Sequence, residues 1–173
     1  MADQVRNLDA LKADQAISVL NKHRLDMLKL RAGTLYHADA SPAISAADAT
    51  DLATAITLAN AIKASLNTHE ASACDATTGQ GVHMAADATN TVTAANATDL
   101  TTLITLTTQE RGKSISHVGA TTPHPVADAT NVPSVTVATD AATAVTLVND
   151  IKTKLNGHFA AAMNHQATNL VAP

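Results

Sequence analysis

The histidines are the residues of this chain whose type and spacing best suit chemistry. They form four pairs, two with a separation of 14 residues and two with a separation of 7: His23 and His37, His69 and His83, His117 and His124, and His158 and His165. Three of them also follow an aspartate by 18 residues, in the pairs Asp51 and His69, Asp99 and His117, and Asp140 and His158. Such regular recurrence predicts a tandem array of one module, and arrays usually bind or build rather than catalyse.

Metal binding is the first chemistry that these residues suggest. Three segments begin with a histidine followed by an aspartate, and another histidine precedes each segment; the candidate ligands are His37, Asp39, His83, Asp87, His124 and Asp128. Two imidazoles and a carboxylate can hold a divalent transition ion whose fourth ligand is water or a neighbouring subunit. Along a continuous helix, however, the two pair separations correspond to about 10 and 21 Å, which is too far for one ion unless the chain folds back.

Structural hydrogen bonding is the second interpretation, and it is the one that we predict. The imidazoles would replace missing aromatic rings, bond the connector backbone and cap helix ends, with no metal or other cofactor bound. A contact that responds to protonation is a third interpretation. We do not expect an enzyme, because the chain has no Gly-rich phosphate loop, no nucleophile elbow and no His-Glu-x-x-His motif, and each polar feature recurs about three times.

The composition argues against several other classes. The net charge is −4 without a basic stripe, so a nucleic-acid partner is not expected, and no apolar run approaches the roughly 18 residues of a membrane span. The N-terminus has no cationic region followed by an apolar run, so we expect no signal peptide and synthesis in the cytoplasm. One cysteine, Cys74, excludes an intrachain disulfide framework. With 1% aromatic residues, the fold is expected to need neighbouring copies, as a homo-oligomer.

Aligned on its aspartates and histidines, the chain divides into four parts. These are an N-terminal helix (1–35), two repeat modules (36–81 and 82–122), and a third module with a C-terminal tail (123–173). The back half of each module has apolar residues at helical spacing. The equivalent structural positions are Asp51, Asp99 and Asp140 at the helix starts and His69, His117 and His158 at the helix ends.

The front half of each module carries turn-forming Asp and Asn residues, β-branched residues and, in the third copy, prolines. These features predict extended connectors. The predicted fold is therefore mainly α, with four principal helices in a tandem helix-plus-extended-connector repeat, and short β pairings between connectors are an open option. The middle helix is expected to be shorter, or to end near Gly112.

The repeat signature is a His, then Ala-Asp-Ala-Thr-Asn, a Val/Ile-x-Ala-Ala step, Ala-Thr-Asp-Leu-x-Thr-x-Ile-Thr-Leu, and a closing Leu-Asn-x-His. Its copies run from His37 to His69, from His83 to Leu106 and, in degenerate form, from His124 to His158. This signature, over roughly three quarters of the chain, resembles Ala/Thr-rich modules of tailed-bacteriophage virion structural proteins. The resemblance implies a non-enzymatic protein of the virion, on the capsid as a decoration, or at the neck or tail, which associates with itself and with other virion proteins. The alternative is a metal- or ligand-binding helical repeat module of a non-viral assembly.

Overall fold

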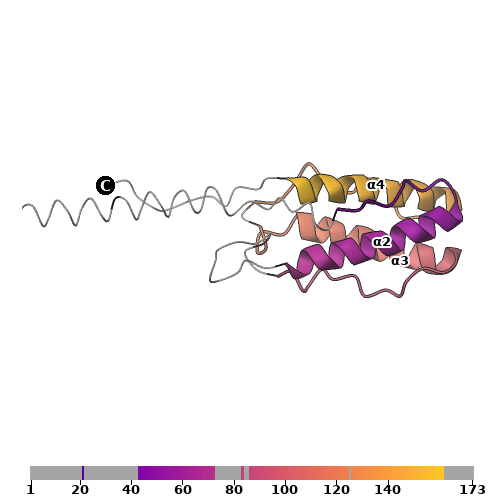
Figure 1. The fold of residues 1–173 in the computed structure, drawn as a ribbon, viewed down its shortest axis with the longest axis horizontal. Helices are drawn as coiled ribbons and strands as arrows, with labels where there is room; N and C mark the ends of the chain where they lie inside the picture. The colour runs from indigo at the N-terminus through magenta and orange to yellow at the C-terminus, as the bar shows by residue number, and fades with distance from the viewer. Residues whose placement is uncertain (1–20, 22–42, 73–82, 84–85, 125, 162–173) are drawn as a thin grey trace, which may run out of the picture.

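Three α-helices of similar length lie side by side in the computed structural model: α2 (Leu52–Ala71), α3 (Leu100–Val118) and α4 (Ala141–Ala160) (Figure 1). The structure describes residues 21, 43–72, 83, 86–124 and 126–161. Each helix packs against the two others, and extended connectors run along the outside of the bundle. None of these three helices combines the length and the apolar character that crossing a membrane requires.

The three helices begin in the same way, because each starts at an Asp-x-x-Thr sequence. Asp51, the N-cap of α2, accepts a hydrogen bond from the Thr54 amide at 2.8 Å, and the Thr54 hydroxyl accepts one from the Asp51 amide at 3.0 Å. This reciprocal box satisfies two amides that have no partner within the helix. The hydrogen bonds from Thr54 also lower the pKa of Asp51. Asp99 and Asp140 cap α3 and α4 in the same way.

All three helices point in the same direction, since the histidines of their last turns meet at one end of the bundle. The ring centroids of His69, His117 and His158 lie 5.1 to 5.3 Å from one another. Between the caps and this end, the inward-facing side chains form successive levels that are fully buried: Leu58, Leu106 and Leu147; Ile62, Glu110 and Ile151; and Leu66, Ser114 and Leu155. Burial of the apolar members of these levels is the main stabilisation of the bundle.

Asparagine side chains on the helices hold two of the connectors. Asn149 of α4 accepts a hydrogen bond from the Ala49 amide at 2.8 Å and donates one to the Ala49 carbonyl at 2.9 Å. The same two-bond pairing recurs at three further places: Asn156 with Ile44, Asn60 with Ala97, and Asn67 with Val92. One side-chain amide thus satisfies both backbone groups of a connector residue, as a neighbouring strand would.

The connector before α4 is held differently, because α3 carries Thr108 and Ile115 where the other helices carry these asparagines. Arg111 donates from Nε to the carbonyl of Val135 at 2.6 Å. Asp150 accepts from the Ser134 amide at 2.8 Å. This connector therefore lies between α3 and α4, the helix that it precedes. The other two connectors likewise lie between two neighbouring helices.

The prediction of four principal helices with an option of β pairings is wrong for the described part of the chain, which has three helices and no strands. Connector backbone groups bind helix side chains rather than one another, so no ladder forms. The predicted N-terminal helix falls almost entirely outside the described residues. The middle helix does not end near Gly112 but continues to Val118, because burial of Ser114, His117 and Val118 in the bundle outweighs the low helix propensity of one glycine.

Candidate metal centre

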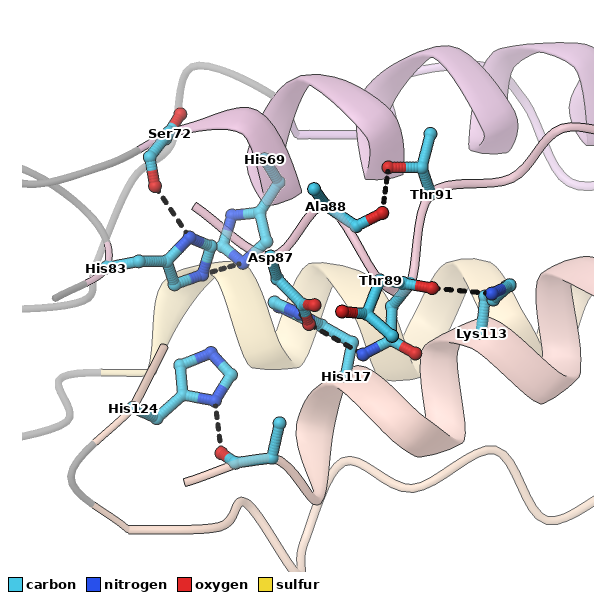
Figure 2. Close-up of polar contacts among 12 residues, drawn as sticks. His69, Ser72, His83, Asp87, Ala88, Thr89, Thr91, Lys113, His117 and His124 are labelled. Carbon is cyan, nitrogen blue, oxygen red and sulfur yellow. Dashed lines mark hydrogen bonds and ion pairs between the residues drawn. The ribbon is translucent and has the colours of Figure 1, made fainter. Parts of the chain in front are cut away.

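Five imidazoles meet at the end of the bundle where the helices finish, and they are called the histidine centre below. Figure 2 shows those of His69, His83, His117 and His124. His69, His117 and His158 belong to the last turns of α2, α3 and α4, whereas His83 and His124 belong to the connectors. All five are at most 1% exposed. Neighbouring rings meet edge to face, with centroids 4.4 to 5.3 Å apart.

Two of these rings are oriented by backbone carbonyls. The Nδ1 of His83 lies 2.8 Å from the carbonyl oxygen of Ser72, and the Nδ1 of His124 lies 3.0 Å from that of Ala120 (Figure 2). A carbonyl can only accept, so in both rings Nδ1 carries the proton and donates. Nε2 is therefore the nitrogen that carries the lone pair in each neutral ring, and that of His83 lies 3.1 Å from Nε2 of His69.

Two further rings are oriented by carboxylates. The Nδ1 of His117 donates to Oδ2 of Asp87 at 2.8 Å, and the Nδ1 of His158 donates to Oδ2 of Asp128 at 2.9 Å. Each of these oxygens also accepts from the amide of an asparagine three residues later, at 2.7 Å. Burial would raise the pKa of both aspartates, but the hydrogen bonds from the asparagine and the histidine outweigh it and lower the pKa, so both carboxyls are ionised.

The pKa values of four of the imidazoles are lowered, which favours their neutral form. Burial lowers the pKa of His83 and of His124 to about 4, and that of His158 to about 3, with repulsion from His117 as a further cause in each case. Burial also lowers the pKa of His117, although Asp87 opposes the shift. Neutral imidazole is the form that coordinates metal ions, so protons do not compete for the lone pairs near pH 7.

The spacing of the ring nitrogens is close to that of a metal site. One nitrogen from each of His69, His117, His124 and His158 lies within 4.8 Å of the other three. The Nε2 atoms of His69 and His83, 3.1 Å apart, form a hydrogen bond, and because the proton of His83 is on Nδ1, Nε2 of His69 donates. The nitrogen of His69 that carries a lone pair is then Nδ1. Nitrogens bound to a tetrahedral ion, with bonds of about 2.0–2.1 Å, are about 3.4 Å apart. The largest separation between the four ring nitrogens would therefore have to shorten by roughly 1 Å or a little more for all four to bind one ion.

The structure brings together residues that the sequence places in different modules. His83 and His124, two of the candidate ligands, lie in the centre, while Asp87 and Asp128 orient the rings of His117 and His158 instead of facing an ion. His37 and Asp39 lie outside the described residues. The helix-end histidines, predicted only as structural repeat positions, supply three of the five rings. The chain folds back between His69 and His83, so the separation expected along a continuous helix does not apply.

Sequence reasoning missed two buried residues beside the centre. Phe159 stacks on His69 with ring centroids 4.3 Å apart. Glu70 is 1% exposed, its carbonyl accepts from the Asp87 amide at 2.8 Å, and burial, with repulsion from Asp87, raises its pKa to about 9. Both residues directly follow a helix-end histidine, as Val118 does in α3. The position directly after each helix-end histidine was therefore the sequence signal that could have identified these buried residues.

Comparison with known proteins gives no relative. No protein-family model, no curated protein and no solved structure matches the chain.

Proposed function

We propose that the bundle binds one divalent transition-metal ion through the histidine centre, with ring nitrogens of His69, His117, His124 and His158 as ligands. The observation that carries this proposal is the orientation of the rings. Three of these four rings, those of His117, His124 and His158, donate Nδ1 to a carbonyl or a carboxylate, so Nε2 is the nitrogen of each that can bind an ion. Metal-bound histidines almost always have such a partner on the second nitrogen, because it fixes the tautomer and raises the basicity of the ligand atom.

The donor set indicates which ions would bind. Four neutral imidazoles suit zinc, nickel, cobalt or copper(II), whereas calcium and magnesium prefer oxygen ligands. The charge of a divalent ion would be balanced by the ionised carboxylates of Asp87 and Asp128, one ring away. Asp87 also lines a surface pocket of about 250 Å³ together with Asn90, Thr122 and Pro123, and this pocket is the route that we assign to ion entry.

The proposed role of the ion is structural. It would join the ends of three parallel helices that are far apart in the sequence, and its binding free energy would add to the folding free energy. This role suits a chain with few aromatic residues. The virion role implied by the repeat signature is a compatible but separate proposal, and mass spectrometry of purified phage particles tests it: absence of the chain from every particle fraction would contradict it.

Calorimetry on the chelator-treated full chain tests metal binding. We expect one zinc ion per chain and a rise in melting temperature on loading. His117→Ala and His158→Ala should each lower the affinity at least tenfold. Asp99→Ala is the matched control, because it weakens the cap at the opposite end of the bundle and should leave the stoichiometry unchanged. Absence of binding, or equal binding by the histidine variants, would overturn the proposal.

A further inference from the structure

The inner face of α3 differs from the inner faces of α2 and α4 at two adjacent levels. Where α2 and α4 carry Ile62 and Ile151, α3 carries Glu110, and where they carry Leu66 and Leu155, α3 carries Ser114. All six side chains are fully buried. The chain itself therefore shows that apolar residues fit these levels, and α3 departs from them with a carboxyl and a hydroxyl.

The polar atoms on this face of α3 form a column. Both carboxyl oxygens of Glu110, the hydroxyl of Ser114 and the Nε2 of His117 are buried and have no hydrogen-bond partner of ordinary geometry among the described residues, although the backbone of Lys63 is close enough to Glu110 to act against the rise of its pKa. Spacings of four and three residues put the three side chains on one face of the helix. Because helical side chains lean toward the N-terminus, the His117 ring leans toward Ser114. The column thus leads from the middle of the core to the histidine centre.

Burying an unpaired polar atom costs more free energy than an ordinary hydrogen bond returns, so several such atoms in a row call for partners. Serine is much smaller than the leucines that share its level. Water enters a protein interior where the space is polar and offers two to four hydrogen-bonding groups. The carboxyl of Glu110 and the hydroxyl of Ser114 supply such groups.

We propose that Glu110 and Ser114 bind a short file of water molecules in the core, and that this file supplies the non-protein ligand of the metal ion in the histidine centre. The second half of the proposal rests on the proposed function, whereas the first half does not. The ion would then have one water as a ligand besides the four imidazoles. The two apolar helix faces offer no polar group at these levels.

The water file is tested in the metal-free protein by a high-resolution crystal structure. We expect ordered water within hydrogen-bonding distance of Glu110 and Ser114. Glu110→Gln, which keeps polar oxygen and nitrogen atoms, should retain the water. The variant Glu110→Ile with Ser114→Leu restores the residues of α2 and α4, so it should fold, melt at a higher temperature and have a dry core. A dry wild-type core would overturn the first half of the proposal.

Cobalt(II) tests the link to the metal ion, since four-coordinate cobalt absorbs visible light severalfold more strongly than five-coordinate cobalt. We expect the weaker absorption for the wild type and Glu110→Gln, and a severalfold rise for Glu110→Ile with Ser114→Leu. Equal spectra for all three proteins would overturn the water ligand. A wild type that binds no cobalt, zinc or nickel would overturn both the metal centre and the water ligand, while the crystal structure would still decide the water file.

Discussion

Acidification of the metal-free protein should destabilise the bundle through its buried imidazoles. The pKa is about 4 for His83 and His124 and about 3 for His158, against 6.5 for a free imidazole. The folded state therefore binds fewer protons than the unfolded state below pH 6.5, and stability is lost as the pH falls from 6.5 toward the folded pKa. At about 1.4 kcal/mol per pH unit, each ring costs about 2 kcal/mol at pH 5, and the three cost about 6 kcal/mol together.

Two buried carboxyls act in the opposite direction. The pKa of Glu70 is raised to about 9, because it is buried and lies near Asp87, and burial raises the pKa of Glu110 as well. A carboxyl with a raised folded pKa loses stability as the pH rises above its unfolded value, so lowering the pH from 7 to 5 returns about 3 kcal/mol at Glu70 alone. Glu70→Gln with Glu110→Gln removes this compensation and leaves the imidazoles to act by themselves.

Urea unfolding followed by circular dichroism at pH 7, 6 and 5, with chelator present, measures both effects. We expect the double variant to be more stable than the wild type at pH 7, and to lose about 6 kcal/mol by pH 5, much of the total stability of a typical domain. The wild type should lose less than half of that. A double variant whose unfolding free energy is constant from pH 7 to 5 would refute the account of the imidazoles as buried neutral groups.

Three further predictions concern the frame that holds the centre. Asp99→Ala should lower the melting temperature by a few degrees in circular dichroism, and no change would mean that the capping box is dispensable. Asn149→Ala should cost about 1–3 kcal/mol in urea unfolding, because it removes two hydrogen bonds to a connector; Thr108→Ala, at the equivalent position of α3, should be nearly neutral. Gly157→Ala places a Cβ against the Asn131 side chain and should cost about 1–3 kcal/mol. Adding it to Asn131→Ala should cost little more, and full additivity would contradict this contact.

Much of the three-helix bundle could be predicted from local sequence. The apolar spacing places the three helices, and the Asp-x-x-Thr motif sets where each begins, since the capping box needs only residues within one turn. The sequence predicted Asp51 only as a residue at a helix start, and in the structure it is the N-cap. The apolar stripe cannot make this assignment, because it does not record which side chain folds back onto the free amides.

The histidine centre could not be assembled from sequence alone, because it depends on the path of the connectors. That path is set by asparagines on a helix bonding a connector from another module, as in the pair formed by Asn156 and Ile44, which are separated by 112 residues. Pairings over such distances leave no periodic signal in a single sequence. A contact between His69 and His83 is therefore visible only once the return of the chain is known.

The three modules can be compared with one another at each aligned position. Where the copies agree, as at Asp51, Asp99 and Asp140, the shared residue does the same structural work three times. Where they differ at a fully buried level, the fold has already shown that an apolar residue is accommodated, so Glu110 and Ser114 cannot be explained by packing. Both of these residues lie on α3 and lead toward His117, whereas Glu70, buried where α3 and α4 carry Val118 and Phe159, is a polar residue of α2. Under the proposal above, the asymmetry at the two levels of Glu110 and Ser114 places water on the α3 side of the histidine centre.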